Sequence, residues 1–501
     1  MRIGSRLLAS FERPPSADVC VEACLATVGV EAEHGRHTYG EVREGARRIA
    51  SALLGEARSL AAERIAILVH PGAAFVEAFF GVLQAGGCVV VLSPIHPASE
   101  TAYFCGDAEV RTILASRDLA SRLDGIGERR VLVLEDLPTP EGSATMPGAL
   151  AGDAALQLYT SGTTGKPKGA VITHENLTVQ QELLAAAWEF KTHDVLLHAL
   201  PLHHMHGLAI ALLTALGVGA TTRMLLAFDA RRLWDEMGTS TVLMAVPTMY
   251  ARLLTAFDEA NPTTRARWAS NARGLRLATS GSAALPTTLA ERWRIIAGDI
   301  PVERFGMTEI GVGMTNPLNG PRKPGSVGLP LPGVETRIVD GELHVRGPSV
   351  FAGYFKRDDA TREAFVDGWF RTGDTVARTD DGYFKILGRT SVDILKSGGY
   401  KLSALEIEEV LRDHPAVLEV AVVGVPDETW GDRVVACVVP RSGMGADCTT
   451  ELLRAFAKQT LAPYKVPREV VCMPDLPRNA VGKVLKAELL RLLAARANRK
   501  A

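Results

Sequence analysis

Strand–helix–strand units recur along the first two thirds of this 501-residue chain. The first unit, at 64–92, has two apolar runs that flank a helical pattern, and similar units follow at 222–246 and 275–305. Strands that alternate with helices form parallel sheets covered by helices, so the pattern predicts an α/β fold. The segment 137–152 is rich in Pro, Gly and Ala, and we expect it to connect two such sheets.

The pattern changes from about Gly341 onward. Two strand-like runs at hairpin spacing, 342–346 and 382–387, predict a β-rich subdomain. A smaller α+β unit follows, and the chain length alone favours at least two domains. We therefore expect an N-terminal domain at 1–389, built of helix-covered sheets plus the β-rich subdomain, and a small α+β domain at 390–501.

Composition argues against several classes of protein. The 55 basic and 57 acidic residues give a net charge of −2, which does not favour nucleic-acid binding. No apolar run approaches the length of about 18 residues that a membrane span needs. The seven cysteines are scattered without zinc-site spacing, which is typical of reduced thiols in the cytoplasm. We expect a cytoplasmic protein, a monomer or homodimer, that acts on small molecules.

A loop rich in glycine, threonine and lysine joins two strand-like runs, 154–158 and 170–173. Residues 159–169 read Tyr-Thr-Ser-Gly-Thr-Thr-Gly-Lys-Pro-Lys-Gly. Glycines let backbone N–H groups approach a phosphate, and hydroxyls and ammonium groups supply further donors. The loop is not a Walker A motif, because Pro167 rather than Ser or Thr follows Lys166. The alternative is a flexible hairpin turn without a ligand.

The loop closely resembles the phosphate loop of the adenylate-forming superfamily, which includes acyl-CoA synthetases and peptide-synthetase adenylation domains. The resemblance implies ATP binding by Thr160, Ser161, Gly162, Thr163, Thr164, Gly165, Lys166 and Lys168. It also implies further ATP contacts from Ser282, Ala283, Glu303, Arg304, Phe305, Gly306 and Thr308, with Asp374 and Arg389 at the ribose. Glu309, with Thr164, would bind Mg²⁺, which prefers carboxylate and phosphate oxygens.

Three histidines, His203, His204 and His206, lie within four positions. One interpretation is a metal site, although no Cys, Asp or Glu cluster lies nearby in sequence. A second is structural histidines with satisfied hydrogen bonds. A third is a wall of the acyl pocket, because the segment resembles the Pro-Leu-Phe-His motif of the superfamily. That resemblance puts His204 beside the carboxylate being activated and His206 close to the acyl pocket.

The C-terminal domain corresponds, by the same resemblance, to a mobile lid. The hinge is assigned to Asp393, and the glycine-rich wall of the coenzyme A tunnel to Ser397, Gly398 and Gly399. Lys483 closes the segment Pro-Arg-Asn-Ala-Val-Gly-Lys and would reach the reacting carboxylate. The predicted catalytic residues are Lys483, Lys168, His204 and Glu309.

Several segments resemble the malonyl-CoA synthetase branch more closely, among them 204–208, 303–311, 316–328 and 388–401. The implied reaction joins malonate, with methylmalonate as a further acid, to coenzyme A through an acyl-adenylate. A second carboxylate needs a cation or several donors. Candidates for this role are Arg292, Arg304 and Arg322, with His206 assisting, while Met205 and Met307 would limit the α-substituent.

Three alternatives remain open at this point. The substrate could be another short or medium carboxylic acid, which a comparison of acids in CoA-thioester formation would reveal. The acceptor could be a carrier protein instead of coenzyme A. A non-catalytic nucleotide-binding protein would release no pyrophosphate from ATP.

Overall fold

The computed structural model describes residues 28–32, 35–138, 146–160, 166–398, 400–478 and 484–498. The chain divides into two compact units. The first unit consists of Met1–Thr336 and Val345–Phe370, and the second of Arg337–His344 and Arg371–Ala501.

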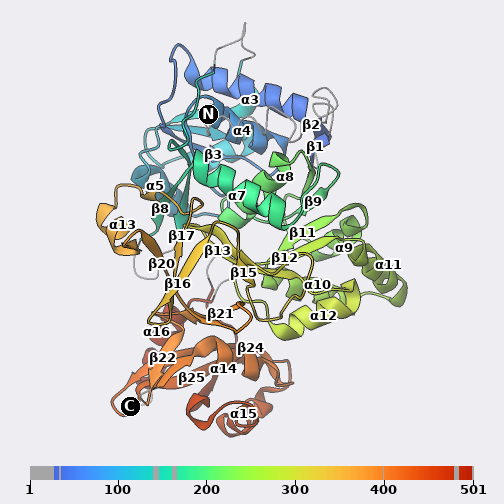
Figure 1. Cartoon of the computed structure of the whole chain (residues 1–501), viewed down its shortest axis with the longest axis vertical. Coiled ribbons are helices and arrows are strands. Elements are labelled where there is room, and N and C mark those ends of the chain that lie inside the picture. Colours follow the sequence, from blue (N-terminus) through green and yellow to red (C-terminus); the bar gives the residue numbers. More distant parts are fainter. Residues whose placement is uncertain are drawn as a thin grey trace. The chain divides into compact units, whose positions relative to one another are not determined.

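Within the described residues, the first unit contains a nine-stranded sheet (Figure 1). The strands, in spatial order, are β15 (Leu329–Pro330), β14 (Gly311–Thr315), β13 (Val302–Met307), β12 (Leu277–Ser280), β11 (Val242–Ala245), β9 (Val195–His198), β10 (Thr221–Met224), β1 (Val28–Ala32) and β2 (Gly35–Thr38). The six strands from β13 to β1 are parallel, and the pairs at both edges are antiparallel.

A second sheet of the first unit has seven strands among the described residues. Its order is β18 (Gly353–Tyr354), β8 (Lys168–Thr173), β7 (Ala154–Thr160), β4 (Cys88–Val91), β3 (Arg64–Leu68), β5 (Thr112–Ala115) and β6 (Arg130–Val133). Strands β7 to β6 are parallel, whereas β7–β8 and β8–β18 are antiparallel. The edge formed by β7, β8 and β18 carries the candidate phosphate loop.

Helices fill the space between the two sheets (Figure 1). Helix α4 (Ala73–Gln84) contacts β3 and β4 of one sheet and β1 of the other, and α7 (His174–Ala187) contacts β7, β8 and β14. Ten of the twelve residues of α4 are buried, as expected of a helix covered on both sides. Helix α3 (Tyr39–Leu54) packs along α4 and begins with a Thr38–Glu41 capping box.

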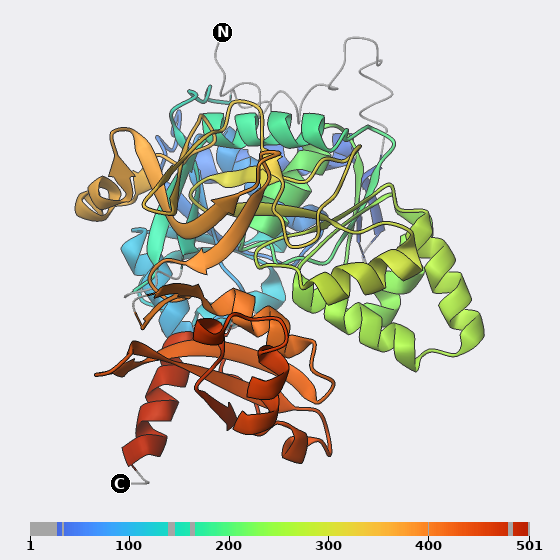
Figure 2. The same ribbon diagram turned by 60° about the horizontal axis from the view of Figure 1, so that its bottom comes forward.

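Four further helices gather beside the β9–β12 part of the nine-stranded sheet. They are α9 (Ala230–Glu236), α10 (Pro247–Glu259), α11 (Pro262–Arg273) and α12 (Thr287–Ala297). Figure 2 shows them as one yellow-green group. Their shared core stacks Trp234 against both Trp268 and Trp293, with ring centroids 5.8 and 5.4 Å apart. This packing holds α12, which follows one of the predicted nucleotide-binding turns.

A smaller sheet is built from five strands of the described chain, with β21 (Phe384–Arg389) beside β20 (Trp369–Arg378). Its other strands are β16 (Glu335–Val339), β17 (Glu342–Arg346) and β19 (Phe365–Val366). The second unit continues with a mixed sheet of β23 (Tyr400–Ser403), β22 (Ile394–Ser397), β25 (Gly431–Pro440), β24 (Val417–Asp427) and β26 (Glu469–Cys472). Helices α14 (Ala404–Arg412), α15 (Thr450–Ala457) and α16 (Lys486–Asn498) complete it.

The predicted α/β architecture is confirmed, and most predicted strands and helices agree with the structure within a few residues. One expectation is wrong: segment 137–152 does not connect two sheets. It leads from β6 to β7, and both strands belong to the seven-stranded sheet, where β5, β3 and β4 lie between them. The boundary expected at 389/390 stays a proposal; both residues fall in the second unit.

Candidate active site

The stem of the phosphate loop is a β-hairpin. Strands β7 and β8 pair antiparallel up to Thr160 and Lys168, and residues 161–165 between them lie outside the described residues. Helix α5 (Ala98–Asp107) supports this stem from the side. The Tyr103 hydroxyl donates to the carbonyl of Pro167 at 2.7 Å, and the Tyr159 ring stacks on Phe104 with centroids 4.3 Å apart. These contacts hold the stem in place, and with it three predicted ATP-binding residues, Thr160, Lys166 and Lys168.

Strand β18 connects Lys168 to Glu309. Tyr354 of β18 pairs with Ala170 of β8, and the Lys168 ammonium lies 5.1 Å from the centroid of its ring. The Tyr354 hydroxyl donates to Glu309 Oε1 at 2.8 Å. Glu309 is only 5% exposed, and its backbone carbonyl accepts a hydrogen bond from the N–H of Phe351. One tyrosine thus brings together two predicted catalytic residues that are 141 positions apart in the sequence.

The turn after β12 lies beside the start of β13. Ser282 has a φ of 69°, and Ser282 and Ala283 are exposed at this turn. The Glu303 carboxylate accepts a hydrogen bond from the N–H of Leu285 at 3.1 Å, so Glu303 fixes the end of the turn. Along β13 and just after it, Phe305, Gly306, Met307 and Thr308 are half-buried. Phe305, predicted to contact ATP, and Met307, predicted to line the acyl pocket, thus lie on the same strand.

The three clustered histidines follow strand β9. His203 and His204 pack ring to ring with centroids 4.1 Å apart, and His96 meets His203 edge-on at 5.0 Å. Burial lowers the pKa of His204 to about 4 and that of His203 to about 2, because desolvation disfavours the imidazolium. These rings are therefore neutral at pH 7. Among the described residues, no group of three or more His, Cys, Asp and Glu side chains is arranged to hold a metal ion.

His206 begins a π-helical segment, η3 (His206–Leu212), and is 6% exposed. Its Nδ1 lies 3.3 Å from the Ser282 hydroxyl. Its Nε2, like that of His204, is buried without a hydrogen-bond partner among the described residues. Burial, with the nearby Arg304 cation adding to the effect, holds the pKa of His206 well below its usual range. A neutral imidazole here has one nitrogen left for a ligand.

Arg304 carries the most unusual charge of the site. It is 3% exposed, and within the described part of the chain its Nε and Nη2 atoms have no hydrogen-bond partner. A Cβ placed on Gly281 would lie 2.4 Å from the guanidinium carbon, so this glycine lets the cation pack against the backbone. Burial lowers the pKa of Arg304 to about 9, which still leaves it charged at pH 7. A buried cation without a partner is costly unless an anion joins it.

The other two arginine candidates have protein partners. Arg292 of α12 is 48% exposed and forms a bidentate ion pair with Asp258 at 2.7 and 2.9 Å. Arg322 pairs with Asp299 at 2.7 Å and donates to the carbonyls of Ile300 and Leu318. The structure therefore groups Arg304, and neither Arg292 nor Arg322, with His206 and Ser282. Met205 is buried two positions after His203.

In the second unit, the two predicted ribose residues are neighbours. Asp374 and Arg389 face each other across β20 and β21, and Arg389 Nε lies 3.2 Å from Asp374 Oδ1. Asp393 follows closely, and its Oδ2 accepts from the N–H of Arg389 at 2.9 Å. The candidate ribose site and the candidate hinge thus share one short segment.

The tunnel residues lie at the end of β22. Ser397 is 4% exposed, and Gly398 has a φ of 59°, with its N–H donating to the carbonyl of Trp430 at 2.9 Å. A Cβ on Gly398 would lie 3.3 Å from the Trp430 ring. Gly399 and Lys483 lie outside the described residues, as do Ser161, Gly162, Thr163, Thr164 and Gly165.

Comparison with known proteins identifies the family. A family model for AMP-binding enzymes matches residues 10–355, and a model for the C-terminal domain of AMP-binding enzymes matches residues 406–483. The first match alone covers more than half of the chain. The chain belongs to the AMP-binding enzyme family. The predicted membership of the adenylate-forming superfamily is thereby confirmed.

Relatives within the AMP-binding enzyme family match along nearly the whole chain. The mitochondrial malonate–CoA ligase of Homo sapiens is 40% identical over 517 residues, covering 92% of this chain and 88% of the relative. ATP-bound MatB from Rhodopseudomonas palustris is 32% identical, with a TM-score of 0.87, and the match covers 98% and 99% of the two chains. A malonyl-CoA ligase in a product complex with methylmalonyl-CoA and AMP is 36% identical, with a TM-score of 0.67 and coverage of 94% and 99%.

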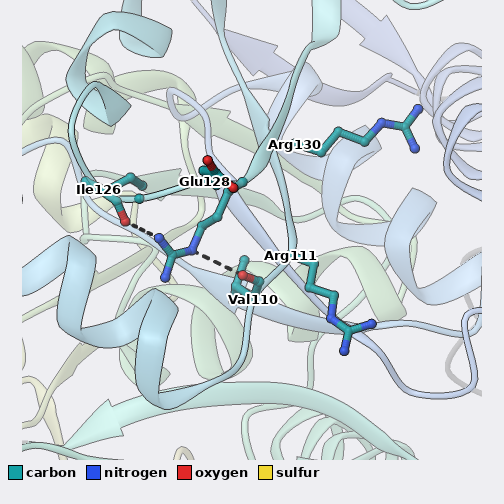
Figure 3. A pocket seen from close by; sticks show the side chains of 7 residues that line it. Val110, Arg111, Ile126, Glu128 and Arg130 are labelled. Atoms are coloured by element: carbon teal, nitrogen blue, oxygen red, sulfur yellow. Dashed lines mark hydrogen bonds between the residues drawn. The ribbon is translucent and has the colours of Figure 1, made fainter.

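Outside the site of this AMP-binding enzyme, a surface pocket of about 720 Å³ is lined by residues 110–111 and 126–130. It lies beside β5 and β6, at the edge of the seven-stranded sheet opposite β18. Figure 3 shows Arg111 and Arg130 extending in different directions. Arg129 donates to the carbonyls of Val110 and Ile126. None of the predicted site residues lines this pocket.

None of the described helices has both the length and the apolar character that a bilayer crossing requires.

Tyr354 is not among the site residues predicted from the sequence. The residue stands in the short segment Gly353–Tyr354, which has no motif of its own before strand pairing is known. Only the pairing of β18 with β8 would have indicated it, because that pairing places Tyr354 opposite Ala170, two residues from Lys168.

Proposed function

We propose that this protein is an AMP-forming acid–CoA ligase that joins malonate to coenzyme A, with malonyl-CoA, AMP and pyrophosphate as products. The observation that supports malonate as the substrate is the buried Arg304 guanidinium near His206, whose Nε and Nη2 have no hydrogen-bond partner among the described residues. The identities to malonate–CoA ligases support the same substrate.

Malonate differs from most acyl substrates in having two carboxylates. One must stay free to react, so the other has to be held away from the reaction by a cation. Arg304 is already desolvated in the protein, and a carboxylate that pairs with it relieves an unfavourable buried charge. The neutral His206 and the Ser282 hydroxyl provide uncharged donors near the same place.

The first half-reaction forms a bond between a malonate oxygen and the α-phosphorus of ATP, and pyrophosphate leaves. Negative charge gathers where the two anions meet, so cations and fixed donors lower the barrier. Lys168, fixed near Tyr354, supplies one cation on the phosphate side. We assign Lys483 to the carboxylate side and the donors at 160–166 to the phosphates.

Mg²⁺ fits this donor set. Glu309 offers a buried carboxylate whose Oε1 is oriented by Tyr354, and hard oxygen ligands of this kind suit the ion. Thr164 would add a hydroxyl. When bound, Mg²⁺ neutralises charge on the phosphates of ATP.

In the second half-reaction the thiol of coenzyme A forms a bond to the acyl carbon, and AMP leaves with the electrons of the acyl–oxygen bond. We assign the approach of the thiol to the segment 397–399. The two half-reactions need different groups at one place, and a lid at 390–501 that turns about Asp393 would exchange Lys483 for the tunnel. Asp374 and Arg389 hold the ribose throughout.

We assign to Met205 and Met307 the role of limiting the size of the substituent on the α-carbon of the acid. Both thioether side chains are adaptable, so a methyl group fits more readily than a longer chain. We therefore propose methylmalonate as a slower substrate. We further propose a cytoplasmic location and a monomeric or homodimeric state, which cell fractionation and light scattering after size-exclusion chromatography would test.

The decisive experiment measures CoA-thioester formation with ATP and Mg²⁺ for six acids. They are acetate, propionate, malonate, methylmalonate, succinate and a medium-chain fatty acid. We expect kcat/KM to be highest for malonate. A preference for monocarboxylates would overturn the malonate assignment but leave the ligase chemistry in place. A carrier protein accepted in preference to coenzyme A, or no pyrophosphate release with any acid, would overturn the ligase assignment itself.

A further inference from the structure

A buried cation in the second unit lies three residues after Lys483. Lys486 is the first residue of α16, and its ammonium lies 2.6 Å from Asp393 Oδ1 and 2.7 Å from Glu408 Oε1. The three side chains are only 11%, 14% and 8% exposed. The two carboxylates outweigh the effect of burial and raise the pKa of Lys486, so the ammonium stays charged.

The two carboxylates are themselves held by backbone groups. Asp393 Oδ2 accepts from the N–H of Arg389 at 2.9 Å, and Glu408 Oε1 accepts from the N–H of Val422 at 2.8 Å. Lys486 thus connects the start of α16 to the segment 389–393, to α14 and to β24. Since both of its partners are held by backbone N–H groups, the cation fixes the start of α16.

The described residues on either side of 479–483 are paired with each other just before α16. Arg478 and Val484 form an antiparallel bridge, and the N–H of Leu485 donates to the carbonyl of Pro477 at 2.8 Å. Arg478 also pairs with Glu419 of β24 at 2.8 Å. Arg478, before the undescribed residues, is therefore tied to β24, and Lys486, after them, to the segment 389–393.

We propose that Lys486 is a positioning residue for Lys483: by tying the start of α16 to Asp393, it fixes the residues that directly follow Lys483 to the segment about which the lid turns. This inference rests on the proposed function, since it assigns Lys483 to the adenylation half-reaction. In addition, the position of Lys483 would depend on the carboxylate of Asp393, the residue assigned to the hinge. Loss of the Lys486 charge should therefore slow adenylation and spare thioester formation.

The competing explanation is an ion cluster that only stabilises the second unit. Removal of a buried cation leaves two carboxylates close together, which is unfavourable for any function of the unit. In that case both half-reactions would slow by the same factor. The ratio of the two rates therefore separates positioning from stability.

The test compares Lys486→Met, Lys486→Arg and the double variant Lys486→Met/Glu408→Gln with the natural chain. The double variant removes one of the two facing carboxylates and replaces the single variant if the latter does not fold. Adenylation is measured as malonate-dependent exchange between ATP and labelled pyrophosphate. The thioester step is measured in reverse, as the single-turnover release of free CoA from malonyl-CoA when AMP is added.

Lys465→Met is the matched control, because Lys465 also pairs with a carboxylate of α14, Glu406, at 2.6 Å. We expect Lys486→Met to slow exchange about 10- to 100-fold, as a displacement of about 1 Å can do, with CoA release changed less than about threefold. Lys486→Arg should retain most of the exchange rate, and Lys465→Met should leave both rates unchanged. As a structural readout, trypsin should cleave after Lys483 faster in Lys486→Met than in the control.

An equal fall in both rates, or unchanged exchange in Lys486→Met, would overturn the positioning role. If malonate is not the substrate, the result is different: the natural chain itself would then show no malonate-dependent exchange. If another acid supports exchange, the same ratio is measured with that acid.

Discussion

Arg304 differs from the other two arginines considered for the second carboxylate in what surrounds its charge. The guanidinium is buried against Gly281, and its Nε and Nη2 have no hydrogen-bond partner in the described part of the chain. Arg292 and Arg322 each already pair with an aspartate. In the proposed function this cation, which has no counter-ion among the described residues, pairs with the second carboxylate of malonate.

Replacement of Arg304 by Met should therefore remove malonate specificity. We expect kcat/KM for malonate to fall about 30- to 5,000-fold, because truncation of one partner of a buried charge pair costs about 2–5 kcal/mol. The value for propionate should stay the same or rise. Arg292→Met, the control, should change both values by less than about twofold, since its ion pair is exposed. Steady-state kinetics with both acids decide this, and an equal loss for both would contradict the role.

The sequence identified candidate site residues, but it did not predict which of them contact each other. The motifs contain Lys168 and Glu309 as candidates, but their link through Tyr354 depends on the pairing of β18 with β8. Sequence also left three arginines equivalent, because the aspartates that neutralise two of them lie 23 and 34 positions away. Such pairs follow from packing and leave no local pattern.

Among the elements, the π-helical segment η3 carries His206, which we assign to the acyl pocket. It starts at His206, and Gly207 follows at a very close approach of two backbones. A Cβ on Gly207 would lie 2.2 Å from the carbonyl oxygen of Pro201. Residues 201–207 can form their tight turn only because position 207 has no side chain, and this turn sets the spacing of the three histidines.

Gly207→Ala should therefore disturb the acyl site far more than its added volume suggests. Backbone atoms cannot move aside as a flexible side chain does, so we expect a loss of about 1–3 kcal/mol in the free energy of unfolding, together with a higher KM for malonate. Gly152→Ala is the control, because a Cβ there would meet nothing within 4 Å. Denaturant unfolding and kinetics measure both effects. A Gly207→Ala protein as stable as the control would refute the close approach.

Elements were the level at which sequence predicted best. Apolar runs and helical periodicity located β3, α4, β4 and the later units, because these patterns are local. The wrong prediction for 137–152, in contrast, concerns a property that is not local. Nothing in the spacing tells whether the next strand, β7, joins the old sheet or starts a new one, since strand order depends on contacts far apart in the sequence.

For the molecule as a whole, buried neutral histidines make stability depend on pH. The pKa values of His174, His198 and His204 are lowered to about 4, mainly by burial, and that of His203 to about 2. All four lie in the first unit. In the unfolded chain these rings take up protons near pH 6.5, whereas in the folded chain they do so only at much lower pH. Between those values the unfolded state binds more protons, so stability falls as pH falls.

Thermal unfolding followed by tryptophan fluorescence should therefore show a falling midpoint between pH 7 and pH 5. Each buried histidine contributes on the order of 1–2 kcal/mol to this loss. His203→Phe removes one titrating ring and keeps an aromatic one, so the midpoint of that variant should depend less steeply on pH. A natural chain whose midpoint stays constant from pH 7 to pH 5 would show that these rings are not neutral and buried.

The order in which the chain builds its two units has a consequence for synthesis on the ribosome. The chain leaves the first unit after Thr336, returns at Val345 and leaves it again after Phe370. Strand β17 emerges as part of this excursion, but its neighbour β20 begins only at Trp369. At about 5–20 residues per second, one edge of β17 waits roughly one to five seconds for its partner. The free edge of β17 is therefore open to mispairing while this short stretch is translated, and a slow codon there would prolong the exposure.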